Sequence, residues 1–179
     1  MFTRITDTEF RSLLYILKNL RPDDREELGA TQGHKYEPRD FARKISGLEK
    51  GRGVSFIAWH DGLPACVWGA YVMTPACLSV WAFGTPDFKR VIRPVTRHIQ
   101  KAMIPVLLKA GFHRAECRAL ATRYDTRRWL NFLGFRAEAV LSGFGVRRED
   151  FILFAWTVDD EAAHSRQSPQ RSRVPLRLD

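Results

Sequence analysis

The chain has 179 residues, of which 45% are hydrophobic and 12% aromatic, which is sufficient for one packed domain without disulfides or structural metal ions. The three cysteines form no CxxC pair and the five histidines follow no metal-ligand spacing, so we expect reduced thiols, no metal site and a cytoplasmic location. An N-terminal export signal and an apolar stretch of about 20 residues are both lacking, which argues against secretion and membrane insertion. The net charge of +9 favours an anionic partner: nucleic acid, a phosphorylated cofactor or an acidic protein surface.

The composition divides the chain into two parts. Residues 1–159 predict one folded domain, and residues 160–179 predict a disordered basic tail, because Ser, Pro, Gln and Arg dominate there and large apolar residues are almost missing. The tail contributes a net charge of only +1, from four Arg and three acids. Most of the positive charge therefore belongs to the folded domain.

The first third of the chain is expected to be mostly helical. Apolar residues three and four positions apart predict a helix from about residue 7, with Thr6 and Glu9 as a capping box. Pro22 and an acidic first turn predict a short second helix that ends at Gly29. A third helix is expected to open at Pro38 and to end before residue 51.

From residue 54 the apolar pattern changes to a period of two. Residues 54–59 and 63–73 predict two strands of a hairpin, because Asp61 and Gly62 between them are typical of a tight turn. Residues 78–83 predict a third strand, which ends at the Gly-Thr-Pro immediately after it.

A long amphipathic helix is expected next, with Pro94 and Pro105 inside it. Each proline removes a backbone donor, so we expect a late start, a kink, or both. The apolar period predicts a buried side made of Val91, Val95, Ile99, Met103 and Val106.

The last part of the domain predicts a strand, a short helix and a hairpin. The strand covers residues 114–120 and the helix covers residues 125–133, closed by Gly134. The two hairpin strands are expected at residues 136–144 and 151–158.

This order of elements, together with the segment from Trp129 to Phe135, resembles the GNAT acyltransferase superfamily, in which a short helix ends in a Leu-Gly-Phe signature. The resemblance implies an α/β (α+β) fold with a mostly antiparallel central sheet flanked by helices. Several stretches, among them residues 19–27 and 81–85, resemble more closely the internal virion proteins of short-tailed phages. That branch implies a role in virion assembly, with phage virion proteins as partners in the host cytoplasm or the virion.

The resemblance also implies a binding turn for acetyl-CoA at the start of the long helix. In the family, glycine amides at this turn hold the diphosphate. Here the turn has one glycine, then Pro86, which cannot donate, and Asp87, which repels phosphate. The positions that would bind the cofactor are Phe83, Gly84, Thr85, Lys89, Arg90 and Arg93.

The candidate catalytic residues are Glu116 as general base and Tyr124 as general acid. Glu116 alternatively forms an outward-facing pair with Arg114 or Arg118, and Tyr124 alternatively packs at the helix entry. The family's usual tyrosine position is Leu130 in this chain.

Lysine and arginine recur every fourth residue on the long helix, over about 18 Å. This basic stripe is either a solvated face, a docking surface for nucleic acid or an acidic partner, or a set of side chains for the CoA phosphates. Its members are Lys89, Arg93, Arg97 and Lys101.

The sequence supports functions from different classes. The first is a phage protein in which the acetyl-CoA site has degenerated and the fold serves virion assembly or protein contacts. The alternative is an active acetyl-CoA-dependent N-acetyltransferase, and a basic nucleic-acid-binding module is a second alternative.

Overall fold

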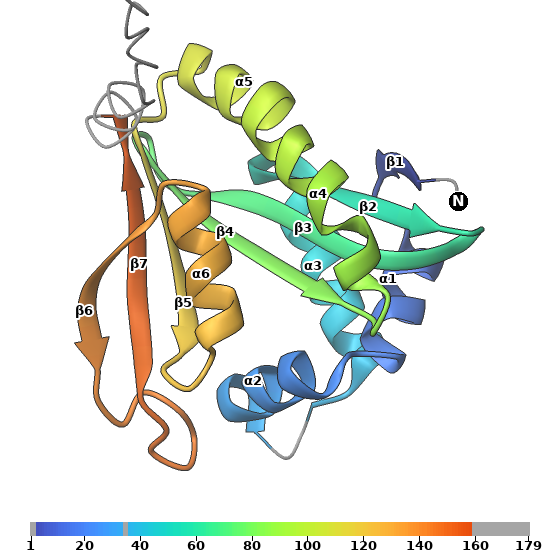
Figure 1. Cartoon of the computed structure of the whole chain (residues 1–179), viewed down its shortest axis with the longest axis horizontal. Helices are drawn as coiled ribbons and strands as arrows, with labels where there is room; N and C mark the ends of the chain where they lie inside the picture. Colours follow the sequence, from blue (N-terminus) through green and yellow to red (C-terminus); the bar gives the residue numbers. More distant parts are fainter. Residues whose placement is uncertain (1–2, 34–35, 159–179) are drawn as a thin grey trace, which may run out of the picture.

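The structure is a computed structural model that describes residues 3–33 and 36–158. The predicted tail of residues 160–179 lies outside the described residues. The described strands form one seven-stranded sheet in the order β1-β2-β3-β4-β5-β7-β6 (Figure 1). The strands are β1 (Thr3–Asp7), β2 (Gly53–His60), β3 (Leu63–Thr74), β4 (Cys77–Gly84), β5 (Arg114–Leu120), β6 (Arg136–Leu141) and β7 (Phe151–Thr157).

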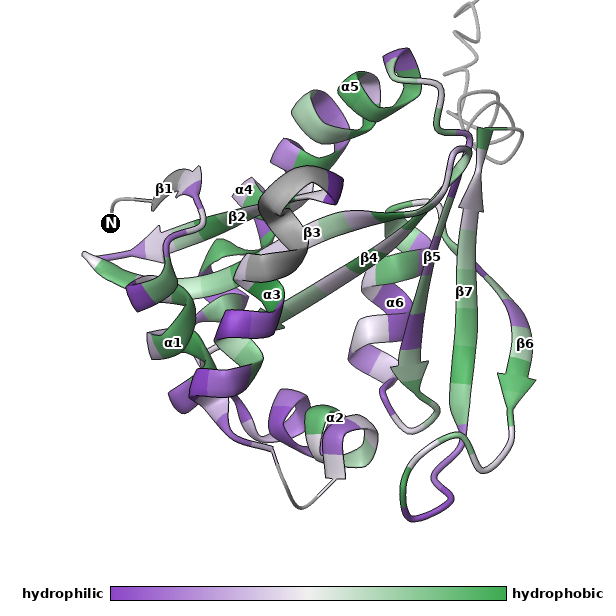
Figure 2. Cartoon of the chain, turned by 180° about the vertical axis from the view of Figure 1, so that it is seen from behind, coloured by the Kyte–Doolittle hydropathy of each residue, from purple (hydrophilic) through white to green (hydrophobic). Residues whose placement is uncertain are grey.

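Helices cover the sheet unevenly. In the described residues α4, α5 and α6 lie on one face, whereas α1 and α3 lie on the other (Figure 1). Seen from behind, β7 and β6 carry no helix in front of them (Figure 2). The helices are α1 (Phe10–Lys18), α2 (Pro22–Gln32), α3 (Pro38–Arg52), α4 (Phe88–His98), α5 (Ile104–Lys109) and α6 (Tyr124–Phe132). Among the described residues, no helix has both the length and the apolar character that crossing a membrane requires.

The sheet is mostly antiparallel, as expected. The pairs β1–β2, β2–β3, β3–β4, β5–β7 and β6–β7 are antiparallel, and β4–β5 is parallel. The predicted hairpin is confirmed, because His60 pairs with Leu63 across a turn with positive φ at Asp61 (46°) and Gly62 (83°). Two positive φ values in succession are the geometry of a two-residue hairpin turn.

The predicted start of the first helix is wrong. Thr6 lies in β1, which pairs with β2, and its hydroxyl accepts a hydrogen bond of 2.9 Å from Trp59 Nε1. The helix α1 begins only at Phe10, and Glu9 makes no side-chain cap. Pairing at the sheet edge therefore overrides a capping pattern that is local in sequence.

Two helices extend past the glycines at which we expected them to end. The helix α2 passes Gly29 and ends at Gln32, next to Gly33 with φ 71°. The helix α3 continues to Arg52, past the predicted stop. A glycine inside a helix costs about 1 kcal/mol relative to alanine, which tertiary packing can offset.

The long helix is interrupted next to Pro105, whereas Pro94 lies inside the continuous helix α4. A π-helical turn, η2 (Ile99–Met103), separates α4 from α5, and the N–H of Ile104 donates to the carbonyl of Ile99. Pro105 cannot donate to the preceding turn, and a wider turn accommodates its ring. The additional residue in this turn rotates the side chains of α5 about the helix axis, so Val106, which we expected to be buried, is 67% exposed.

Candidate active site in the parting between two strands

The central feature of the site is the parting of β4 from β5. The two strands pair at residues 77–79 with residues 114–116, and beyond this short ladder no pairing joins them (Figure 1). We call the ladder the paired end and the termini at Gly84 and Leu120 the open end. Parallel strands that separate in this way leave space between two hydrogen-bonding edges.

The helix α2 holds the open end. The N–H of Gly84, at the end of β4, donates to Asp24 Oδ2 at 2.7 Å. The N–H of Leu120, at the end of β5, donates to Glu27 Oε2 at 3.1 Å. Residues three apart lie on one face of a helix, so two carboxylates of α2 bind one strand end each.

Arg123, the residue before α6, joins these carboxylates. Its Nη1 lies 3.1 Å from Asp24 Oδ1 and 3.5 Å from Glu27 Oε2, and its Nε lies 3.1 Å from Asp125 Oδ1. Arg21 adds a second guanidinium, with Nε 2.9 Å from Asp24 Oδ2. Arg123 and Asp24 are almost fully buried. Burial raises the pKa of Glu27, and the hydrogen bond from Leu120 and the charge of Arg123 oppose that rise.

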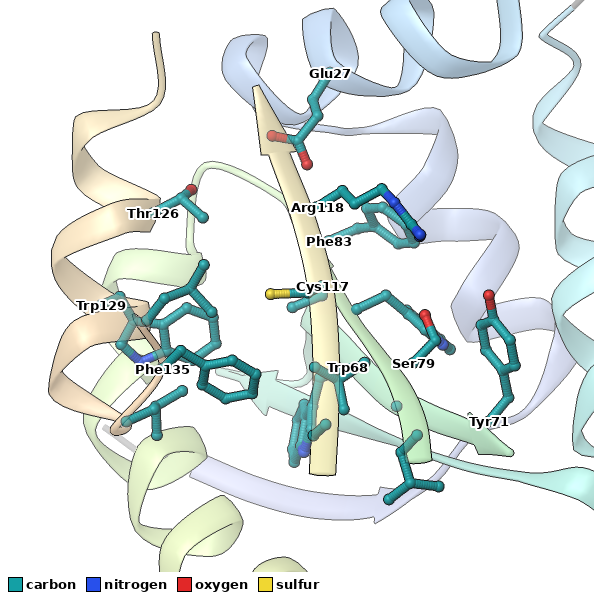
Figure 3. Close-up of a pocket in the computed structure, with 18 of the residues that line it drawn as sticks. Glu27, Trp68, Tyr71, Ser79, Phe83, Cys117, Arg118, Thr126, Trp129 and Phe135 are labelled. Carbon is teal, nitrogen blue, oxygen red and sulfur yellow. The ribbon is translucent and has the colours of Figure 1, made fainter. Parts of the chain in front are cut away.

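A cavity of about 520 Å³ occupies the parting and reaches both faces of the sheet (Figure 3). On the α4–α6 face its wall includes Trp68, Cys117 and Trp129. On the opposite face its wall includes Phe83 and Arg118. The cavity therefore connects two faces that the sheet would otherwise separate.

The cavity wall is largely apolar and carries few polar groups. The indole N–H of Trp68, a residue that is 2% exposed, has no hydrogen-bond partner among the described residues. Burial raises the pKa of the Cys117 thiol to about 12, so this thiol stays protonated at neutral pH. Glu27 reaches in from α2, and Thr126 from α6 (Figure 3).

In the turn expected to bind the cofactor, backbone amides donate hydrogen bonds to groups of the same chain. The amide of Gly84 is bound by Asp24, and the amide of Thr85 donates to the carbonyl of Ala65 at 2.9 Å. A Cβ on Gly84 would lie 2.6 Å from the Phe88 side chain, so this glycine serves internal packing. Of the six positions expected here, Phe83 lines the cavity and Gly84 and Thr85 are buried in the turn.

The basic side chains expected near the cofactor are exposed on α4. Arg90 Nε lies 3.0 Å from Asp87 Oδ1, whereas Lys89 and Arg93 extend into solvent. The four members of the basic stripe, Lys89, Arg93, Arg97 and Lys101, are all exposed.

The two candidate catalytic residues lie outside the residues that line the cavity. Glu116 accepts a hydrogen bond of 2.7 Å from Arg114 Nε, and Arg114 also pairs with Glu138. This is the paired alternative that the sequence left open. Tyr124 is 73% exposed in the first turn of α6. Both catalytic roles stay predictions from the resemblance.

Sequence reasoning missed the residues that shape the site. Asp24 lies in the acidic first turn of α2 and Glu27 lies three residues further on, and Trp68 and Cys117 match ordinary core positions. No spacing in the sequence indicates that residue 123 lies next to residue 24.

Comparisons with known proteins give a likeness in structure. No protein-family model matches the chain, and no curated protein sequence matches it. The ribosomal-protein-S18-alanine N-acetyltransferase of Escherichia coli is similar, with a TM-score of 0.64 and 15% identity over 98% of this chain and 100% of that chain. A GNAT phosphinothricin acetyltransferase of Sinorhizobium meliloti in complex with acetyl-CoA has a TM-score of 0.69 and 12% identity, over 88% of this chain and 89% of that one.

A third structure, described as an acetyltransferase of Salmonella typhimurium with its cofactor acetyl-CoA, has a TM-score of 0.68 and 11% identity, over 88% of this chain and 94% of that one. The fold of these neighbours is compatible with the acetyltransferase alternative and gives no support to the phage virion branch. Identities this low establish the fold alone. The chain therefore has the GNAT acyltransferase fold, with a seven-stranded mixed sheet whose parted strands enclose the candidate site.

Proposed function

We propose that the protein is an N-acyltransferase that moves an acyl group from a coenzyme A thioester to an amine. The observation that supports this proposal is the cavity in the parting of β4 and β5, which opens toward both faces of the sheet. A donor and an acceptor can then meet from opposite faces without competing for one entrance. Structural neighbours with this fold bind acetyl-CoA.

The cavity fits the thioester part of such a donor. Its wall is largely apolar, and the unpartnered N–H of Trp68 is a buried donor that a carbonyl or amide oxygen would satisfy. The diphosphate fits differently, because the amides of Gly84 and Thr85 are already bonded. Lys89 and Arg93 on the exposed side of α4 would hold its charge by side chains instead. When bound, the thioester supplies an activated acyl carbon.

Glu27 is the residue that we assign as proton acceptor for the amine. Its contacts with Leu120 and Arg123 both use Oε2, and Oε1 accepts no hydrogen bond from the described residues. The side chain reaches from α2 toward the cavity (Figure 3). Burial raises its pKa, which makes it a stronger base than an exposed glutamate.

The reaction balances with these groups. The amine nitrogen forms a bond to the acyl carbon, the carbon–sulfur bond breaks, and Glu27 takes the proton that the amine loses. The thiolate leaves and receives a proton from solvent, giving free coenzyme A and an amide.

The acceptor face favours an amine that also carries an anionic group. Arg118 lines the cavity there, and its guanidinium lies 5.7 Å from the ring centroid of Phe144. Arg118 is exposed, and none of the ion pairs between described residues includes it. A carboxylate or phosphate on the acceptor would supply that partner.

The test is acyl transfer to a panel of amines, monitored by thiol release and by the mass of the product. Glu27→Gln keeps an oxygen for Leu120 but cannot take a proton, so kcat should fall by about 100-fold while KM changes little. Glu26→Gln, on the exposed side of the same helix, is the matched control and should leave kcat unchanged. The absence of transfer to every amine tested would refute the proposal.

The roles of Glu116 and Tyr124 are tested in the same assay. If Glu116→Gln or Tyr124→Phe lowers kcat more than Glu27→Gln, the assignment of the base to Glu27 is wrong. The role in virion assembly stays a prediction from the sequence.

A further inference from the structure

The volume of the cavity exceeds what an acetyl group needs. Protein interiors are close-packed, and voids larger than a water molecule are few. The cavity measures about 520 Å³ and holds the end of the pantetheine chain and the amine as well as the acyl group, of which an acetyl group has only three non-hydrogen atoms. Apolar surface that lines a cavity open to solvent gains free energy when a ligand covers it.

One part of the cavity lies next to the paired end, on the α4–α6 face. Phe112 precedes β5, and the amide of its neighbour His113 donates to Ala76 beside the first residue of β4. We call this part the apolar lobe. Its wall consists of Ile99, Met103, Ile104, Leu107, Phe112 and Phe135.

The π-helical turn shapes this lobe. Ile99 and Met103 are the first and last residues of η2, and both line the cavity. Leu107 comes next on α5 and lines it as well, whereas its neighbour Val106 faces solvent. π-helical turns are rare, and those that occur are often found at functional sites, because they displace side chains from the regular helical spacing.

The apolar lobe lies at the paired end, and a thioester can pass between the strands only on the open-end side of the ladder. The strands are hydrogen-bonded at residues 77–79 and 114–116, so a pantetheine chain can lie between them only toward the open end. The basic residues Lys89 and Arg93, which suit its phosphates, are on the first turns of α4, next to that open end. An acyl group at the far end of the pantetheine chain would therefore point toward the apolar lobe.

We propose that the apolar lobe binds the acyl chain of the donor, and that the preferred donor carries a medium-chain, unbranched acyl group rather than acetyl. This inference rests on the proposed function and names its substrate class. One observation supports it independently of that function: the wall of the lobe is made of six apolar side chains.

The expected effect of chain length can be derived from burial. Each methylene group moved from water into the lobe improves Kd by about fourfold. Titration calorimetry with acetyl-, butanoyl-, octanoyl- and dodecanoyl-CoA should show affinity that rises steeply with chain length and then levels off when the lobe is full. Equal affinity for acetyl-CoA and octanoyl-CoA would overturn the proposal.

Two substitutions on neighbouring residues of α5 make the test specific. Leu107→Trp fills the lobe and should weaken octanoyl-CoA by at least tenfold while leaving acetyl-CoA unchanged. Val106→Trp adds the same side chain on the exposed side and should change neither. Equal losses in both variants would show that the chain binds elsewhere and would refute the proposal.

Leu107→Ala gives a second readout if the larger side chain prevents folding. It enlarges the lobe, so the chain length at which affinity levels off should increase. Failure of this inference differs from failure of the proposed function. If acyl transfer occurs but Kd does not depend on chain length, only the inference about the apolar lobe is refuted. If Kd depends on chain length but no amine is acylated, only the proposed function is refuted.

Discussion

Replacing Arg123 by methionine tests how the open end of the parted strands is held. Arg123 is 6% exposed and lies within 3.5 Å of three carboxylates: Asp24, Glu27 and Asp125. Methionine keeps an apolar stem in the same space but removes the charge. Three carboxylates would then share the single guanidinium of Arg21, which leaves negative charge uncompensated in a buried site.

The expected loss is about 3–5 kcal/mol in the free energy of unfolding, as for other buried ion pairs that lose one partner. Urea denaturation monitored by tryptophan fluorescence measures it, with the m-value as a check that unfolding stays two-state. Arg90→Met is the matched control, because the exposed Arg90–Asp87 pair should contribute less than about 1 kcal/mol. A loss no larger than that of the control would refute the view that Arg123 holds the open end.

A partial rescue separates charge from packing. Adding Asp24→Asn to Arg123→Met removes one of the uncompensated carboxylate charges and keeps an oxygen for the amide of Gly84. The double variant should therefore be more stable than Arg123→Met alone. A double variant that is less stable by the sum of the two separate losses would show that the charges do not interact.

Further predictions concern titration, reactivity and packing. Burial raises the pKa of Glu27 above its ordinary 4.5, so the stability that its protonation contributes is full below pH 4.5 and is lost as the pH rises through the raised pKa. When the free energy of unfolding is measured in urea across this pH range, the Glu27→Gln variant should lack that part of the pH dependence. The three cysteines are buried and the pKa of Cys117 is about 12, so iodoacetamide at pH 8 should alkylate the native protein far more slowly than the unfolded protein, and one thiol reacting at the unfolded rate would contradict this. Lys89→Glu combined with Arg93→Glu should weaken acyl-CoA roughly tenfold and leave acyl-pantetheine, which lacks the diphosphate, unchanged. Gly69→Ala should lower stability by about 1–3 kcal/mol in the same urea assay, because its Cβ would lie 2.6 Å from the carbonyl oxygen of Val54.

The elements that the sequence predicted well are those specified by contiguous residues. The strand at residues 114–120 has the predicted bounds, and the hairpin turn at Asp61 and Gly62 has the predicted geometry. Errors occurred where distant residues decide. Thr6 and Glu9 form a good capping pattern, but Thr6 pairs in the sheet because β2 presents an open edge to it.

The site could not be predicted in the same way. A cavity between parted strands depends on where pairing stops, and pairing is a property of two segments more than 30 residues apart in sequence. Its wall is built from Trp, Cys and Leu side chains that also suit a closed core. The family's glycine turn was a usable signal, because its loss drew attention to the turn in which the amides of Gly84 and Thr85 are bonded within the chain. It did not indicate that an aspartate from α2 occupies one of them.

The helix α2, which binds the ends of β4 and β5, also brings the proposed base to the cavity. Where β4 and β5 separate, amides on the edges that face each other have no strand partner, and a buried unpaired amide costs about 1–3 kcal/mol. Asp24 and Glu27 satisfy one such amide each, so their spacing on α2 is required by the parting itself. Glu27 uses one carboxylate oxygen for this purpose and leaves the other for chemistry. Glu27→Ala would remove both roles together, whereas Glu27→Gln removes only proton transfer. A comparison of kcat and the free energy of unfolding in these two variants therefore separates support of the strands from catalysis.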